Sequence, residues 1–299
     1  MNSQSNISTQ VQHKWLTVVN LLKAPSIILL LVWMIVPLSM TVYYSFVEYN
    51  LLYPGPKLFI GLENYSYFST DSAFFPALFN TLVLVGSVLT ITVVLGLALA
   101  LLVNQPFFGR GVVRVLLISP FFIMPTVNAL IWKNMMMDPN YGIFSVIADF
   151  FNVVPINFLE DLPLASIILM VSWQWTPFAL LIFMTSLQSQ DTEQKEAAQL
   201  DGAGFWSIFR FLTLPHLARP IAIVVMIQTI FHLSLFAEIF VTTGGGPGFA
   251  STNLAWLIYR QAFLAFDVGV ASAGGVFAII LANIVAFFLI RAVGKNLTE

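Results

Sequence analysis

EAAQLDGAGFWSIFRFLTLP, residues Glu196 to Pro215, is a charged stretch in a chain that is otherwise apolar. Four acidic residues, one lysine and one arginine lie between Asp191 and Arg210, although only 9% of the 299 residues are charged and 59% are hydrophobic. Because charged side chains are costly inside a lipid bilayer, such a stretch lies outside the membrane when its neighbours lie inside it. The sequence on either side of this segment is therefore needed to infer its location and function.

The composition is that of an integral membrane protein. A soluble domain carries about a quarter of its residues as charges, whereas this chain has 9% charged residues, 14% aromatic residues and a mean hydropathy of +0.89. A helix needs about 20 apolar residues to cross about 30 Å of hydrocarbon. Six runs have about this length, and we predict an all-α protein with six transmembrane helices, at residues 24–46, 77–103, 115–131, 164–187, 221–240 and 271–290.

The same composition excludes several other classes of protein and of binding site. A net charge of −2 is unlike that of a basic nucleic-acid-binding protein, so we expect no nucleic-acid partner. Zero cysteines exclude a thiolate metal site and a disulfide, and the three histidines lie in separate parts of the chain, so no metal site is predicted. Residues 1–13 are polar and the first apolar run is of full length, so we expect that run to be retained as a span.

The lysines and arginines predict the orientation. When alternate loops are assigned to opposite sides, nine of the twelve basic residues lie on one side: Lys14, Lys23, Arg110, Arg114, Lys195, Arg210, Arg219, Arg291 and Lys295. By the positive-inside rule this side is cytoplasmic. The cytoplasmic side then carries the N-terminal tail at 1–23, the C-terminal tail at 294–299 and the Glu196 segment, while residues 24–293 form the six-span domain.

The cytoplasmic loop at 191–215 is predicted to have structure of its own. Asp191 and Gln194 resemble a capping box at the start of a helix. The turn at 201–204 contains two glycines and is expected to break this helix. Residues 205–214 are predicted to form a second, amphipathic helix that ends at Pro215. Such a loop either only joins two spans or docks on another protein. The apolar face is too short to insert into lipid, so the sequence favours a protein partner.

This loop resembles the EAA loop of bacterial ABC importer permeases, in which it forms a coupling helix that docks on a cytoplasmic ATPase. The resemblance implies a type I ABC importer permease fold in a bacterial inner membrane. It also implies coupling roles for Glu196, Ala197, Ala198, Asp201, Gly202, Leu214 and Pro215.

Other segments resemble the carbohydrate-importer branch, and in particular the larger half of the maltose permease. They are residues 44–46 (YSF), 61–65 (GLENY), 80–81 (NT), 109–114 (GRGVVR) and 243–247 (TGGGP). The chain departs from that larger half because it has no extra N-terminal helices, and its loop at 47–75 is too short for a large outer insertion. It is similar to a minimal six-span version.

The fifth predicted span carries polar residues at membrane depth. Gln228 and His232 are four residues apart and so share a helical face with Leu235, one turn further on, and Phe231 lies beside them. Such residues either line a cavity or only bond a neighbouring helix. The resemblance places substrate-contacting positions on these four residues and so favours the cavity.

The fourth predicted span contains WQWTPF, residues 173–178, where Pro177 is expected to kink the helix. The resemblance suggests that Gln174, Trp175 and Phe178 face a sugar, because rings stack on apolar C–H faces while amides bond hydroxyls. An aromatic belt at the membrane interface is the alternative, but these residues lie far from both ends of the span. In the third span, Pro120 and Pro125 predict a flexible or kinked helix. Asn128 either points into the pathway or bonds a neighbour, and the sequence does not decide between the two.

The predicted function follows from what is present and what is missing. The chain has no Gly-x4-Gly-Lys-[Ser/Thr] loop to hold ATP phosphates, so we expect no enzyme activity, and ATP-Mg is expected in partner subunits. The resemblance implies half of a pore for a carbohydrate or polyol. Its partners would be a second permease, two ATP-binding subunits and an extracytoplasmic binding protein. An ion-coupled secondary transporter is the alternative. Ion coupling usually needs acidic residues embedded in the membrane, and in this sequence only Glu238 lies near a span, at its outer end.

Overall fold

The structure is a computed structural model that describes residues 3–53 and 55–297, with side chains described for residues 22–53 and 55–291. Parts of the two predicted tails, at residues 1–2 and 298–299, lie outside the described residues. The described chain consists of helices, joined by short segments that form two isolated β-bridges. The all-α prediction is confirmed.

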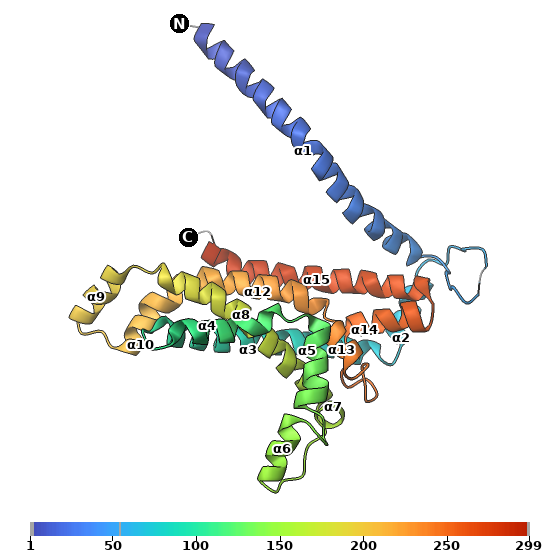
Figure 1. The fold of residues 1–299 in the computed structure, drawn as a ribbon. Helices are drawn as coiled ribbons and strands as arrows, with labels where there is room; N and C mark the ends of the chain where they lie inside the picture. The colour runs from blue at the N-terminus through green and yellow to red at the C-terminus, as the bar shows by residue number, and fades with distance from the viewer. Residues whose placement is uncertain (1–2, 54, 298–299) are drawn as a thin grey trace.

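Figure 1 shows the helices, coloured in chain order from the N-terminus to the C-terminus. The first half contains α1 (Ser3–Tyr44), α2 (Glu63–Thr70), α3 (Phe74–Asn104), α4 (Arg110–Ile118), η1 (Ser119–Phe122), α5 (Pro125–Ile131), η2 (Trp132–Met136), α6 (Ile143–Phe150) and α7 (Phe158–Asp161). The second half contains α8 (Pro163–Gln188), α9 (Thr192–Leu200), α10 (Phe205–Ile208), η3 (Phe209–Thr213), α11 (Leu214–His216), α12 (Ala218–Leu233), α13 (Ala237–Val241), α14 (Leu254–Tyr259), η4 (Arg260–Leu264) and α15 (Val268–Leu297).

Six stretches of the described chain have the length and apolar composition of membrane spans when bent helix pairs are counted as one. Four are single helices, at residues 22–44, 74–104, 163–188 and 268–291. Two are pairs, Arg110–Phe122 with Pro125–Met136 and Phe205–His216 with Ala218–Leu233, bent by 106° and 56°. The six predicted spans are therefore present, and two of them are broken.

The third span is broken more strongly than the sequence predicts. Pro120 and Pro125 were expected to kink one helix over 115–131, but Ile123 and Met124 are extended and separate η1 from α5. Pro125 has no backbone N–H and pushes the residue before it out of the helical region, so a new helix starts at Pro125.

The predicted ends of two other helices are wrong. The fifth span was predicted to reach Phe240, but α12 ends at Leu233 and a separate short helix, α13, begins at Ala237. Pro215 was predicted to end the amphipathic helix, but helical backbone continues through α11 to His216. Pro215 is the second residue of α11, which follows η3 without a break. Around Pro177, where a kink was expected, α8 is likewise one uninterrupted helix.

Figure 1 shows α9 and α10 at one end of the bundle and α2 and α14 at the opposite end. The helix α1 runs away from the bundle and approaches it only near its C-terminal end, and its apolar stretch at 22–44 is exposed in the single chain. The buried core lies between α3, α8 and α12. It has two main clusters, which include Leu84, Val88, Ile167 and Met170 in one and Leu180, Phe183, Leu217 and Val224 in the other.

The helices α3 and α8 approach each other closely at Gly96. A Cβ atom added to Gly96 would lie 2.7 Å from the Cβ of Ala179 and 3.1 Å from the backbone nitrogen of Leu180. We therefore expect Gly96→Val to force the helices apart and cost roughly 1–3 kcal/mol or more. The melting temperature of the purified transporter should fall. Gly86→Val, on the exposed side of the same helix with no atom within 4 Å of the added Cβ, should leave it nearly unchanged; equal effects of both variants would contradict this packing.

Candidate functional site

The predicted coupling loop begins with a capped helix. Asp191 is the N-cap of α9, and its Oδ1 accepts a hydrogen bond from the backbone N–H of Glu193 at 2.9 Å. An N-cap carboxylate satisfies a free N–H and interacts well with the positive end of the helix dipole. The helix start inferred from the sequence is confirmed at this residue.

The helix α9 ends in a glycine turn. Gly202 has a left-handed φ of 84°, its N–H bonds Gln199 O at 3.0 Å, and Ala203 N–H bonds Ala198 O at 2.9 Å. This pair of bonds is a Schellman motif, which favours glycine at the left-handed position. Because a Cβ added to Gly202 would meet nothing within 4 Å, the backbone conformation, and not crowding inside this chain, is what requires glycine here.

The surface of the loop is more apolar than its charges suggest. Leu200 is 89% exposed, Trp206 75% and Phe211 71%. The predicted coupling residues are exposed or half-buried: Glu196, Ala197, Ala198, Asp201, Gly202, Leu214 and Pro215. The exposure of Leu200 and Trp206 was not predicted, because helical spacing alone does not show whether an apolar residue is covered.

The loop is attached to the bundle on its C-terminal side. His216 Nε2 lies 2.9 Å from the carbonyl oxygen of Ser186, near the end of α8. Leu217, at the bend before α12, is fully buried, and Thr213 is buried as well. Movement of α9 and α10 would therefore be passed to α8 and α12 rather than absorbed by a free linker.

Three aromatic side chains, Phe121, Phe178 and Phe231, surround the ring of Trp175. We call these four residues, which come from η1, α8 and α12, the aromatic wall. The ring centroid of Trp175 lies 5.1 Å from Phe231, 5.9 Å from Phe178 and 5.7 Å from Phe121, and Phe121 stacks on Phe178 at 5.6 Å. Phe231 is 57% exposed, and the other three rings are half-buried. The wall thus presents ring surface to the outside of this single chain.

Two polar residues of α12 lie behind the wall. Gln228 is fully buried, accepts a hydrogen bond from the hydroxyl of Thr92 at 2.7 Å and donates one to Trp175 O at 3.3 Å. His232 is also buried, 5.0 Å from the ring of Trp175, and its Nε2 has no hydrogen-bond partner among the described residues. The predicted pair is therefore brought together with Trp175.

Leu235 is not on the same helical face as these residues. The helix α12 ends at Leu233, so the prediction that Leu235 continues its face by one turn is wrong. Leu235 is buried, and its carbonyl accepts a hydrogen bond from the side chain of Asn253. Ser234 and Leu235 belong instead to the break before α13.

Gln174 and Asn128 bond each other. Asn128 Nδ2 donates to Gln174 Oε1 at 2.9 Å and to Met170 O at 3.3 Å, and Gln174 Nε2 donates to Ile123 O at 2.6 Å. Both side chains are buried. Of the two interpretations left open for Asn128, this structure shows the bond to a neighbouring helix.

The glycine-rich loop at 242–253 is held by the start of α3. Asn80 Nδ2 donates to the carbonyls of Phe249 and Thr252, each at 2.9 Å, and the hydroxyl of Thr81 accepts from Leu254 N–H at 3.0 Å. Gly245 has a φ of 85°, and an added Cβ would lie 2.3 Å from the indole nitrogen of Trp256. The Asn-Thr pair thus fixes a loop about 170 residues away in the sequence.

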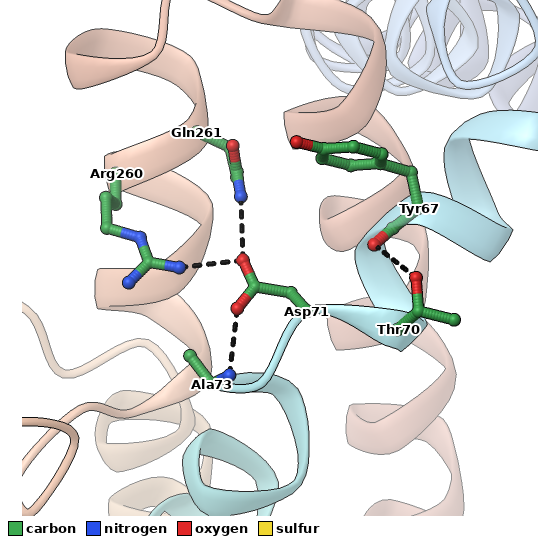
Figure 2. A network of polar contacts seen from close by, with 6 residues as sticks. All are labelled: Tyr67, Thr70, Asp71, Ala73, Arg260 and Gln261. Atoms are coloured by element: carbon green, nitrogen blue, oxygen red, sulfur yellow. Dashed lines mark hydrogen bonds and ion pairs between the residues drawn. The ribbon is translucent and has the colours of Figure 1, made fainter.

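A polar network fixes the same end of the bundle (Figure 2). Asp71, between α2 and α3, accepts hydrogen bonds from Arg260 at 2.7 Å and Gln261 at 3.1 Å through one carboxylate oxygen and from Ala73 N–H at 2.8 Å through the other. The guanidinium of Arg260 also lies over the ring of Phe249. Arg260 therefore links the α2–α3 connection to the glycine-rich loop.

The fold is shared with solved transporters. A structure of a bacterial ABC transporter involved in the import of the acidic polysaccharide alginate superposes with a TM-score of 0.79 and 22% identity, covering 97% of this chain and 99% of that chain. This likeness confirms the predicted fold.

Sequence comparison gives closer relatives. A probable ABC transporter permease protein, y4oQ, of Sinorhizobium fredii is 37% identical over 251 residues, which are 83% of this chain and 81% of that protein. The trehalose/maltose transport system permease protein MalF of Thermococcus litoralis is 31% identical over 281 residues, 93% of this chain and 94% of that protein. Residues 74–299 match the family described as the binding-protein-dependent transport system inner membrane component. The chain belongs to this family of transport permeases.

Proposed function

We propose that the chain is one of two permease subunits that form the pore of an ATP-driven, binding-protein-dependent importer for a carbohydrate or polyol. The observation that carries the proposal is the exposed, capped loop helix α9 in a chain of this family. The ligand class is supported by relatives that are named as permeases for trehalose/maltose and, in Agrobacterium fabrum, for sulfoquinovosyl glycerol.

The proposed complex contains a second six-span permease, two ATP-binding subunits that hold ATP-Mg, and an extracytoplasmic binding protein. A solved alginate importer of the same fold forms a complex with a periplasmic protein that carries an alginate pentasaccharide, which supports the last of these. The chain would lie in a bacterial inner membrane with both termini in the cytoplasm, as the distribution of its lysines and arginines favours. ATP hydrolysis would take place outside this chain.

The aromatic wall is the proposed place where this subunit contacts the ligand. Trp175, Phe178 and Phe231 offer ring faces to the apolar side of a sugar ring. The remaining candidates for the site lie behind or beside these rings: Gln228, His232, Gln174, Asn128 and Leu235. In this structure these side chains are buried, so they would reach a ligand after the helices move.

In the proposed mechanism, a displacement of the loop helices is transmitted to the helices of the bundle. Closure of the ATP-binding subunits would move α9 and α10, and the contacts of His216 with α8 and of Leu217 with the core would carry the motion to α8 and α12. These two helices hold three of the four rings of the wall. A rigid-body rotation of the bundle against the sister permease would then open the pathway alternately to each side.

Reconstitution tests this proposal. The chain purified with its companion subunits, and placed in vesicles with the binding protein, is expected to accumulate a carbohydrate only when ATP is supplied on the side of the ATP-binding subunits. The chain alone, in vesicles with a proton or sodium gradient and no ATP, is the matched control and is expected to accumulate nothing. Gradient-driven uptake by the chain alone would instead establish an ion-coupled carrier.

A further inference from the structure

The break in the third span leaves irregular backbone within the bundle. The helical turn η1 ends at Phe122, and α5 begins at Pro125 after a bend of 106°. Ile123 and Met124, with ψ angles of 132° and 141°, lie between the two helices. Irregular backbone at membrane depth is tolerated only where its polar groups find partners inside the protein. The carbonyl of Ile123 therefore needs a donor from another helix.

Gln174 of α8 supplies that donor and also contacts the far side of the break. Its Nε2 donates to Ile123 O at 2.6 Å, and its Oε1 accepts from Asn128 Nδ2, on α5, at 2.9 Å. The same amide of Asn128 donates to Met170 O, so α5 is tied to α8 twice. Gln174 is 4% exposed and Asn128 is fully buried. One carboxamide side chain thus bonds a residue within the break and a residue after it.

The bend also sets the position of one ring of the aromatic wall. Phe121 lies two residues before Ile123, in η1, and contacts both Trp175 and Phe178 of α8. Gln174 is the neighbour of Trp175 on the same helix. The bond that holds the break and the rings that Phe121 contacts are therefore built on one short stretch of α8.

We propose that Gln174 is a positioning residue: by bonding the backbone of the break and the helix after it, Gln174 fixes the bend of the third span and holds Phe121 in the aromatic wall, where Phe121 is a further ligand-contacting residue. The part about Phe121 rests on the proposed function, because it takes the wall as the carbohydrate-facing surface. A glutamine suits this place because it has both a donor and an acceptor at the end of one side chain. Methionine, which is of similar size, has no N–H and only a weak acceptor.

The bend is tested by a distance measurement in the assembled transporter. Spin labels are attached to cysteines introduced at the exposed positions Val115 and Met135, one on each side of the break, in a chain that has no cysteine of its own. Thiols of the companion subunits are replaced beforehand. We expect a narrow distance distribution with Gln174 intact and a broadened or shifted one in Gln174→Met. Thr185→Ala, which removes a hydroxyl bonded within α8 to Leu181 O, is the control and should keep the narrow distribution.

An unchanged distribution in Gln174→Met would overturn the positioning role. If Gln174→Met does not assemble, Asn128→Ala removes only the bonds on the far side of the break and is measured in the same way. A broadened distribution in Asn128→Ala supports the proposal, and a narrow one overturns it.

Uptake separates the role of Phe121 from that of Gln174. Phe121→Leu should raise the KM for carbohydrate uptake about fivefold, the factor that corresponds to one aromatic contact, while the spin-label distances stay unchanged. An unchanged KM would remove Phe121 from the ligand site. If the assembled complex shows no ATP-driven carbohydrate uptake at all, the proposed function fails, whereas the distances still decide whether Gln174 holds the bend.

Discussion

Gly202→Val is expected to abolish the stimulation of ATP hydrolysis by the ligand-loaded binding protein. Gly202 ends α9 with a φ of 84°, a conformation that costs a residue with a Cβ roughly 1–2 kcal/mol and a β-branched residue more. The substitution would displace the Schellman turn and tilt α9 away from its docked position. We expect stimulated hydrolysis to fall about tenfold or more, since about 1.4 kcal/mol corresponds to a factor of ten, with insertion of the chain unchanged.

Two control variants show why glycine is needed in this turn. Gly202→Asn should keep most of the stimulation, because asparagine tolerates the left-handed conformation. Gly204→Ala should also keep it, because Gly204 has an ordinary φ of −76° and open space at its Cβ position. Normal stimulation in Gly202→Val would show that this turn does not transmit force. Loss of stimulation in all three variants would show instead that a partner subunit contacts both positions so closely that neither tolerates a side chain.

Trp175→Ala is expected to reduce carbohydrate uptake about tenfold or more, a loss of about 1.4 kcal/mol. Trp175 is the ring that Phe121, Phe178 and Phe231 all contact, and its own carbonyl bonds Gln228. Its removal takes away the centre of the proposed ligand surface. The measurement is the initial rate of uptake per assembled transporter, over a range of ligand concentrations.

Trp173→Ala is the matched control for this prediction. Trp173 lies two residues away on α8, is 39% exposed and contacts Trp132 rather than the wall. We expect it to change uptake little, and Trp175→Phe to keep most of the activity because a ring remains. If Trp173→Ala and Trp175→Ala reduce uptake equally, the effect comes from packing of α8 and the wall is not the ligand site.

The spans and the helix and turn of the loop at 191–215 were predictable from the sequence because both are local features. Apolar run length depends on the thickness of the bilayer, and the ends of α9 are set by a capping aspartate and a left-handed glycine within a few residues. The resemblance of residues 196–215 to the EAA loop identified the family, which the match over residues 74–299 confirms.

The broken helices were less predictable because tertiary contacts stabilise them. Two prolines in the third span indicated a kink, but the 106° bend also needs Gln174, far away in the sequence, to donate a hydrogen bond to the carbonyl of Ile123. No proline or glycine marks the end of α12. The carbonyl of Leu235, which follows this helix end, accepts a hydrogen bond from the side chain of Asn253. A hydropathy pattern carries no information about such hydrogen bonds between distant residues.

The grouping of the candidate residues was predicted in part, and their roles stay a prediction. Trp175, Phe178, Gln228, Phe231 and His232 do lie together, whereas Gln174 bonds Asn128 and Ile123. The place of Phe121 in the wall depends on the break and has no local signal in the sequence. The NT pair at 80–81 was noted only as a resemblance, and the structure gives its physical role as the clamp of the glycine-rich loop.

Cross-linking from Leu200 tests the central claim most directly. Leu200 is 89% exposed at the end of α9, and a photoreactive residue placed there reaches whatever covers the loop. In the assembled transporter we expect a single covalent product with an ATP-binding subunit, with a yield that changes between the ATP-bound and nucleotide-free states. A product with the extracytoplasmic binding protein, or labelling of Leu200→Cys in intact cells by a reagent that cannot cross the membrane, would contradict the account.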